Sequence, residues 1–272
     1  MNLDAEARKE PKTTLQAMDI HADWQRQFRT SENDRFYNLA FDDIAKVFGP
    51  PDELAVVDGG CGSATKSLHL ARRGYRVLGL DFSAAILEHA RRDAQAAGFA
   101  DRMEFRQADL TALELPTASA DRVLCWGVLM HVPDVTKAVS ELARIVKPGG
   151  IAVISEGNVR SPQAWFLRTL KKLLGRDLGE VIATPAGLEF WEPHPTGRLM
   201  TRQADIPWLI REFGKHGLEL QQRRAGQLTE IYMILPWRPL RLLVHAINNF
   251  WYRFVRFGGP SYGNLLVFRR PD

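Results

Sequence analysis

The chain has 272 residues, of which 45% are hydrophobic and 25% are charged, and its formal net charge is +4. A chain of this length and composition can bury a full hydrophobic core, which excludes a disordered or repetitive class of protein. Its two cysteines, Cys61 and Cys125, are too few for a disulfide framework, and its polar N-terminus lacks a signal-peptide pattern, so a cytoplasmic location is expected.

Helices and strands alternate along the first part of the chain. Residues 35–48 place Phe36, Ile44 and Phe48 on one helical stripe, which predicts a helix that ends at the following Gly-Pro-Pro turn. Strands that alternate with helices of about ten or more residues indicate βαβ units on a parallel sheet. Strands are predicted over 54–60, 75–81, 103–110, 121–129 and 151–157, and helices over 65–73, 83–98 and 134–146.

A glycine-rich stretch, VVDGGCGSAT at 56–65, contains the end of the first predicted strand. Thr65 stands where the third glycine of a dinucleotide-binding fingerprint belongs, which disfavours a nicotinamide cofactor. Asp58 ends the strand, and the glycines that follow leave the backbone open to a ligand. Asp81 ends the next strand, where a carboxylate can accept two hydrogen bonds from a ribose diol. The two strands together predict a nucleoside site.

Further short motifs follow in a fixed order on the predicted elements. They are Asp58-Gly59-Gly60-Cys61-Gly62, Asp81-Phe82-Ser83, Gln107-Ala108-Asp109-Leu110, the strand Asp121–Leu129 with Met130-His131-Val132-Pro133-Asp134, and Lys147-Pro148-Gly149-Gly150. In this order they resemble the motifs of class I S-adenosylmethionine-dependent methyltransferases of the small-molecule type. The resemblance covers about residues 35–157, and Ala64 departs from it because many members carry a third glycine there.

The resemblance implies a role for each matching residue. The glycine loop would line the methionine part of S-adenosylmethionine, with Asp58 near its amino group, and the residues after the fourth strand would border the sulfonium. The implied cofactor-binding residues are Asp58, Gly59, Gly60, Cys61, Gly62, Asp81 and Phe82 (ribose and adenine), Asp109 and Leu110 (adenine), and Cys125, Trp126, Gly127 and His131. Structural alternatives remain, because Asp58 could cap a helix, Asp109 could cap a turn, and Cys125 could be a buried small residue.

Methyl transfer from a sulfonium requires alignment of the acceptor and exclusion of water, and a base is optional. If the acceptor is a hydroxyl, His131 is the best-placed base, although a histidine there could simply hold a backbone carbonyl. Glu156, at the end of the fifth strand, is a second candidate. S-adenosylhomocysteine would be the product.

The other motifs narrow the class of acceptor. No paired histidine spacing or cysteine pair indicates a metal, so none is expected. Cys125-Trp126-Gly127-Val128 stands where many enzymes that methylate nucleic-acid bases carry an Asn-Pro-Pro-Tyr type of motif. A small-molecule acceptor is therefore expected, with no nucleic-acid partner.

Two segments outside the predicted core are expected to cover the acceptor. Residues 1–34, which contain Trp24, form a predicted lid over the cofactor. Residues 158–200 are predicted to begin with a basic amphipathic helix and to continue as a loop, in which Trp191 and His194 border the substrate.

The C-terminal part, residues 201–272, is predicted to complete the core sheet and to contain a helix over 239–257 with a wide aromatic face. Residues 158–272 hold 17 Lys and Arg against 9 Asp and Glu, a net charge of +8, which suits an anionic partner. The helix could pack on the sheet, line an apolar pocket, or dock on anionic lipid at the membrane periphery; its arginines exclude a membrane span.

The sequence therefore predicts one α/β protein with a Rossmann-like, doubly wound, seven-stranded and mostly parallel sheet, in which 35–157 form the core that binds S-adenosylmethionine. The predicted activity is methyl transfer to a small or lipid-linked acceptor, at oxygen or nitrogen rather than carbon. Two alternatives stay open, a protein that binds S-adenosylmethionine without catalysis and, less favoured, a nicotinamide-dependent oxidoreductase.

Overall fold

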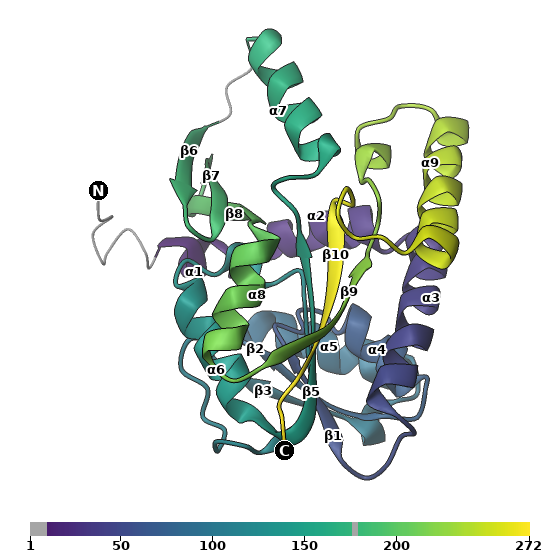
Figure 1. Cartoon of the computed structure of the whole chain (residues 1–272), viewed down its shortest axis with the longest axis vertical. Helices are drawn as coiled ribbons and strands as arrows, with labels where there is room; N and C mark the ends of the chain where they lie inside the picture. Colours follow the sequence, from purple (N-terminus) through teal and green to yellow (C-terminus); the bar gives the residue numbers. More distant parts are fainter. Residues whose placement is uncertain (1–9, 176–178) are drawn as a thin grey trace.

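The computed structural model describes residues 10–175 and 179–272, and Figure 1 shows the path of the chain. Residues 1–9 of the predicted lid segment and residues 176–178 of the predicted insertion lie outside the described residues. The described chain forms a large sheet with helices on both faces and a small second sheet.

The large sheet has seven strands. Their bounds are β1 Ala55–Gly59, β2 Arg76–Asp81, β3 Met103–Gln107, β4 Ala120–Trp126, β5 Val146–Gly157, β9 Glu219–Ala225 and β10 Gly263–Arg269. They are ordered β3-β2-β1-β4-β5-β10-β9. β10 is antiparallel to both of its neighbours, and the remaining pairs are parallel. The predicted seven-stranded, mostly parallel fold is therefore confirmed.

Two layers of helices cover the two faces of this sheet. One layer contains α3 (Ser31–Phe48), α4 (Thr65–Ala71) and α5 (Ala84–Ala96), and the other contains α6 (Val135–Ile145) and α8 (Ile206–Lys215). Successive residues of β1 serve both layers: Val56 packs in the cluster with α3, and Val57 packs in the cluster with α6. This alternation is what a strand buried on both faces requires.

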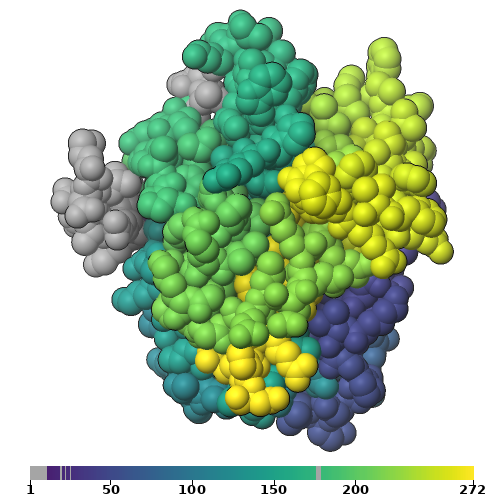
Figure 2. All heavy atoms as spheres, in the orientation of Figure 1, coloured from purple at the N-terminus to yellow at the C-terminus, as the bar shows by residue number. Residues whose placement is uncertain are grey.

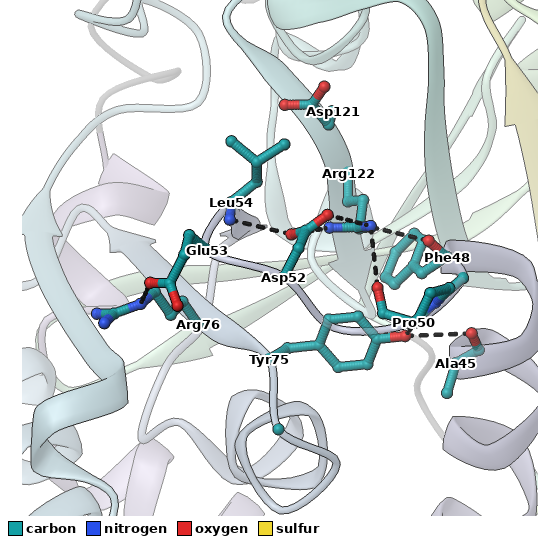
Figure 3. Close-up of polar contacts among 12 residues, drawn as sticks. Ala45, Phe48, Pro50, Asp52, Glu53, Leu54, Tyr75, Arg76, Asp121 and Arg122 are labelled. Atoms are coloured by element: carbon teal, nitrogen blue, oxygen red, sulfur yellow. Dashed lines mark hydrogen bonds and ion pairs between the residues drawn. The ribbon is translucent and has the colours of Figure 1, made fainter.

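A polar cluster closes the end of the sheet where β1 and β4 begin (Figure 3). Arg122 of β4 donates to both carboxylate oxygens of Asp52, at 2.8 and 3.0 Å, and to the carbonyl of Phe48 at 2.8 Å. The Tyr75 hydroxyl donates to the carbonyl of Ala45 at 3.1 Å. These bonds satisfy the last carbonyls of α3 and fix the turn into β1. This end of the sheet is structural, so ligand chemistry is expected at the opposite end.

The segment after β5 contains α7 (Pro162–Leu173) and then a second, antiparallel sheet of β6 (Glu180–Thr184), β7 (Gly187–His194) and β8 (Gly197–Ala204). The predicted helix is thus present, but the prediction of a loop after it is wrong. The expected boundary at residue 200 falls inside β8, so the inserted sheet continues to Ala204.

Two residues obscure the strand pattern of this sheet in the sequence. Pro193 lies beyond the last residue of β7 that pairs with β6, so its missing N–H removes no bond to that neighbour. Glu189 occupies a buried position of β7, where an alternating pattern would predict an apolar residue. Its carboxylate accepts from buried Arg202 of β8 at 2.6 Å.

The predicted helix over 239–257 consists of α9 (Arg238–Phe250) and a following π-helical turn, Trp251–Val255. α9 packs beside α3 at the periphery of the molecule (Figure 1) with His245 and Asn248 buried, whereas Phe250 is 59% exposed. The aromatic face therefore points outward, and the interpretation in which it packs on the sheet is wrong. Over the described residues, no helix has the length and apolar character needed to cross a membrane.

Candidate active site

A cavity of about 600 Å³ lies over the carboxyl ends of the parallel strands. This volume falls within the range of about 300–1,000 Å³ that is usual for ligand pockets. One half is lined by residues that follow β1, β2 and β3, and the other by residues at the ends of β5 and β9 and by the segment that enters β10. Because β4 lies between these two groups of strands, the residues at its exit stand at the middle of the cavity.

The glycine loop after β1 is held against β2. The N–H groups of Gly60 and Cys61 both donate to the carbonyl of Leu80, at 2.7 and 2.9 Å. Gly60 has a φ of 78°, and a Cβ there would lie 2.3 Å from a methyl carbon of Val128. Only glycine fits this position, and its backbone lines the cavity, where a nucleoside or amino-acid ligand could contact it.

Asp58 is buried at the end of β1, and Ser67 donates a hydrogen bond of 2.5 Å to its carboxylate. Burial raises the pKa of Asp58 to about 6, although the Ser67 bond and the charge of Lys66 oppose this shift. The carboxylate lines the cavity and retains acceptor capacity there. It can therefore accept from an ammonium group, and its interaction with Ser67 is not the predicted helix cap.

Asp81 and Asp109 both line the cavity, and each is also held by the protein. Asp81 accepts from the backbone N–H groups of Gly62 and Ser83, each at 3.0 Å. These bonds use one oxygen each, so each oxygen can accept one more bond from a diol. One oxygen of Asp109 accepts from the Thr111 N–H at 2.9 Å. The other oxygen pairs with Lys12 of α1 (Glu10–Thr14), which belongs to the predicted lid segment.

Trp126 and Gly127 line the cavity at the exit of β4. The Trp126 ring stacks on Phe41 of α3, with ring centroids 5.5 Å apart and an interplanar angle of 18°. Of the other residues predicted to bind the cofactor, Gly60, Cys61, Gly62, Phe82 and Leu110 also line the cavity. Gly59 and Cys125 are not among the described lining residues; Cys125 is fully buried, as the structural alternative predicted.

His131 lines the cavity in the short 3-10 helix Leu129–His131. Its Nδ1 lies 3.0 Å from the carbonyl of Met200, and burial lowers its pKa to about 4. The ring stacks on Trp24, with centroids 4.7 Å apart. His131 is thus neutral at pH 7, and the bond to Met200 is the structural role weighed for it from the sequence.

Glu156 lines the cavity at the end of β5. One carboxylate oxygen accepts from the backbone N–H groups of Val128 and Leu129, at 3.1 and 2.8 Å. Burial raises its pKa to about 7, and its second oxygen has no partner among the described residues. Glu156 therefore positions the turn after β4, next to the predicted methyl site.

The N-terminal helices cover the cavity. Trp24 and Phe28 of α2 (Met18–Phe28) line it together with Lys12. Arg29 donates to the Thr65 hydroxyl at 2.8 Å, and this bond ties the segment to the start of α4. In contrast, Trp191 and His194, which were predicted to border the substrate, lie on β7 and are not among the lining residues that the structure describes.

Several ionisable residues of the cavity were missed from the sequence, among them Lys66 and Glu230. Lys66 of α4 lies with its Nζ 3.7 Å from the centroid of the Tyr37 ring, and Glu230 follows β9. Lys66 stands in an ordinary helical position directly after the glycine loop, and Glu230 lies in a stretch without periodicity. The one sequence signal for Lys66 was its charge, which is unusual in a helix that is predicted to pack on the sheet.

An open glycine loop, an acidic residue that ends β2 and a lid over the strand ends are the features expected of the donor site of a class I S-adenosylmethionine-dependent methyltransferase. Residues 57–154 match the family model described as a methyltransferase domain. A ubiquinone biosynthesis O-methyltransferase from Leptothrix cholodnii is 37% identical over 126 residues, which cover 46% of this chain and 52% of that protein. A methyltransferase from Streptomyces halstedii is 28% identical over 194 residues, 65% of this chain and 69% of that protein.

The fold agrees with these matches. The magnesium protoporphyrin IX methyltransferase from Synechocystis PCC 6803, solved with bound S-adenosylhomocysteine, superposes with a TM-score of 0.59 over 90% of this chain and 86% of that chain, at 18% identity. The matched stretch spans about half the length of the ubiquinone biosynthesis relatives. The chain resembles the class I S-adenosylmethionine-dependent methyltransferases in its methyltransferase domain, residues 57–154, and in its fold, and S-adenosylmethionine is the cofactor that these likenesses support.

Proposed function

We propose that the protein transfers a methyl group from S-adenosylmethionine to an oxygen atom of a small, largely apolar acceptor. The observation that carries this proposal is the extension of one cavity from the residues after β1, β2 and β3 to the ends of β5 and β9. A protein that only bound the cofactor would not need the second half of this cavity. The choice of oxygen rests on the O-methyltransferase relatives.

The residues of the first half fit the cofactor. Asp58 would accept from its amino group, Asp81 would accept from its ribose hydroxyls, and the backbone at Gly60, which lines the cavity, would border the chain between them. When bound, S-adenosylmethionine supplies a methyl group on a positively charged sulfur. Trp126 and the lid residue Trp24 would exclude water from the middle of the cavity, where the acceptor has to be aligned.

A transfer assay tests this activity. Purified protein, S-adenosylmethionine with a labelled methyl group and a cell extract are incubated, and the products are divided between water and organic solvent. We expect label in the organic fraction because the surface of the cavity as a whole is mostly apolar. Binding of S-adenosylmethionine without any transfer would favour a non-catalytic binding protein, and failure to bind it would reopen the nicotinamide alternative.

We further propose that the protein docks on anionic lipid, from which a lipid-linked acceptor enters the cavity. Its support is a group of exposed apolar side chains on α7, on α9, and on the segments on either side of α9. Met233 and Ile234 belong both to this group and to the cavity lining, so the apolar surface continues into the cavity. The group consists of Trp165, Phe166, Leu173, Leu174, Met233, Ile234, Trp237, Leu240, Leu243, Ile247, Phe250, Phe254 and Phe257.

The charges around this apolar group support a lipid partner rather than a second copy of the chain. Figure 2 shows α7, in teal, and the α9 region, in yellow-green, at the same end of the molecule. Exposed cations on both elements are interspersed with the apolar residues; they are Lys171, Lys172, Arg238, Arg241, Arg253 and Arg256. Aromatic side chains that enter the interface while arginines contact phosphate are the usual pattern of interfacial helices.

Vesicle sedimentation tests the lipid proposal. At low salt, the protein is expected to sediment with vesicles of phosphatidylglycerol and phosphatidylcholine, and the double variant Phe250→Ser, Phe254→Ser is expected to bind at least about tenfold more weakly. Leu54→Ser, an exposed apolar residue beside the polar cluster of Figure 3, is the matched control. Equal binding of all three proteins would refute the proposal. Dimers that the Phe variant disrupts in gel filtration would assign the surface to a second copy.

A further inference from the structure

Two cavity residues carry charge without a polar partner. The structure gives no hydrogen bond or ion pair to the Lys66 ammonium or to the Glu230 carboxylate over the residues it describes, and the Lys66 ammonium lies over the face of Tyr37. Both side chains line the cavity. Both residues are half-buried, and a charged group that is partly removed from water without a partner is costly, so their presence in one cavity points to a ligand-related role.

Glu230 lies in the acceptor half of the cavity. It directly precedes the 3-10 helix Ile231–Met233, and it follows β9, the edge strand farthest from β3. Its backbone N–H donates to the side-chain carbonyl of Gln163 of α7 at 2.6 Å. This bond fixes the backbone at Glu230 while its carboxylate remains free to meet the acceptor.

The two bases considered from the sequence are already engaged. His131 bonds to the carbonyl of Met200 through Nδ1, and Glu156 holds two backbone N–H groups of the turn after β4. Of the two acidic residues in the acceptor half, Glu156 and Glu230, only Glu230 makes no hydrogen bond or ion pair through its carboxylate to the residues that the structure describes.

Resting on the methyl-transfer function proposed above, we propose that Glu230 is the base that accepts the proton of the acceptor hydroxyl, that Lys66 sets its ionisation, and that the acceptor is a phenol or enol. In the reaction the hydroxyl proton passes to Glu230 as the oxygen–methyl bond forms and the methyl–sulfur bond breaks, with the bonding pair staying on sulfur. Tyr37, Trp126 and Tyr262 line the same cavity and provide aromatic surfaces for such a ring.

The electrostatic environment fits this assignment. Burial raises the pKa of Glu230 to about 7 against the opposing charge of Lys66, and burial lowers the pKa of Lys66 to about 7. A carboxylate of this basicity is matched to a phenol, whose pKa is near 10, and is far too weak for an aliphatic alcohol. Tyr37, Tyr232 and Tyr262 also face Glu230, but their raised pKa values keep them neutral.

Two more acidic groups lie next to this cluster. Asp58 interacts with Lys66, and Glu156 interacts with Tyr262. Lys66 is thus the one cation among the described groups that acts on Glu230. A positive charge stabilises the ionised carboxylate, so removal of Lys66 raises the pKa of Glu230. The fall in activity at low pH, the acid limb of the pH profile, then moves to higher pH.

The pH dependence of full-length protein with catechol as the acceptor tests this proposal, because catechol itself stays protonated near pH 7. Glu230→Gln is expected to lower kcat by about 10²–10⁴-fold and to remove the acid limb near pH 7. Lys66→Met is expected to shift this limb upward. Glu156→Gln is expected to keep it, and Glu219→Gln, an exposed residue of β9 outside the cavity lining, is the matched control.

A binding measurement separates chemistry from folding. With S-adenosylhomocysteine bound, 4-nitrocatechol is mixed with each protein, and its visible absorbance reports how much phenolate forms. Glu230→Gln is expected to bind S-adenosylhomocysteine within about twofold of the wild type by calorimetry, and to show less bound phenolate. An acid limb that survives in Glu230→Gln, or disappears in Glu156→Gln instead, would overturn the assignment of the base.

Assays of the wild-type protein distinguish a failure of this inference from a failure of the proposed methyl-transfer function. Methyl transfer to extract components but not to catechol would reject the phenol class and leave the methyltransferase activity standing. Transfer to neither, with S-adenosylmethionine bound, would remove the proposed function and the Glu230 role together.

Discussion

Replacement of Asp81 by alanine is expected to weaken the binding of S-adenosylmethionine at least about 100-fold. The carboxylate ends β2 inside the cavity, where each oxygen can still accept a bond from a ribose hydroxyl. Two charge-assisted hydrogen bonds are worth about 1.5–3 kcal/mol each, which gives this factor. The variant also loses the acceptor for the Gly62 N–H, which helps to shape the glycine loop. Calorimetric titration with S-adenosylmethionine measures the loss.

Two companion variants make this result interpretable. Asp81→Asn keeps one acceptor oxygen and the shape of the side chain, so its affinity is expected to lie between those of the wild type and Asp81→Ala. Asp101→Ala, an exposed aspartate on the segment that leads into β3, is expected to bind normally. An unchanged dissociation constant for a folded Asp81→Ala protein would show that the nucleoside does not lie on β2.

The core of the fold could be predicted from the sequence because its signals are local and agree with one another. Ser83 caps α5 by accepting from the Ile86 N–H, as its position before a helical pattern predicted. The predicted strands before and after this helix end within three residues of β2 and β3. In a sheet buried on both faces, continuous apolar runs leave few other arrangements.

The inserted sheet could not be predicted because its stabilising contacts are not local. Glu189 reads as a surface residue, and only its pairing with Arg202, 13 residues away, makes a buried position acceptable. The orientation of α9 was hidden for a related reason. Its spacing shows which residues share a face, but the burial of Asn248 depends on bonds to Thr229, outside the helix.

The donor half of the site was predicted better than the acceptor half. Asp58, Asp81 and the glycines follow strands directly, so the topology alone brings them to one cavity. Glu230 reaches the same cavity from a segment with neither strand nor helix periodicity. Residues of this kind are positioned by tertiary contacts such as the bond to Gln163, which no spacing rule contains.

Arg202→Met is expected to be the most destabilising single change outside the cavity. The guanidinium is 2% exposed; it pairs with Glu189 and donates to the carbonyls of Leu129 and Val132, each at 2.9 Å. Methionine fills the space but leaves a buried carboxylate without its cation, which costs about 3–5 kcal/mol. For a chain of this size the melting temperature should fall by roughly 6–20 °C in calorimetry.

Two further variants identify the cause of this destabilisation. Arg198→Met, on the same strand, removes a partly exposed pair with Glu180 and is expected to cost no more than about 1 kcal/mol. The double variant Glu189→Gln, Arg202→Met removes the uncompensated charge, so it should be more stable than Arg202→Met alone. A single variant as stable as Arg198→Met would contradict the assignment.

The bonds of Arg202 also connect the second sheet to the cavity. The carbonyls that it holds belong to the turn that carries His131, and His131 in turn bonds to Met200 of β8. Loss of the guanidinium therefore frees this turn from two sides, and Trp24 of the lid loses the fixed ring on which it stacks. At a temperature where Arg202→Met is still folded, we expect weaker binding of S-adenosylmethionine than in Arg198→Met, because the inserted sheet positions the turn that forms part of the cavity wall.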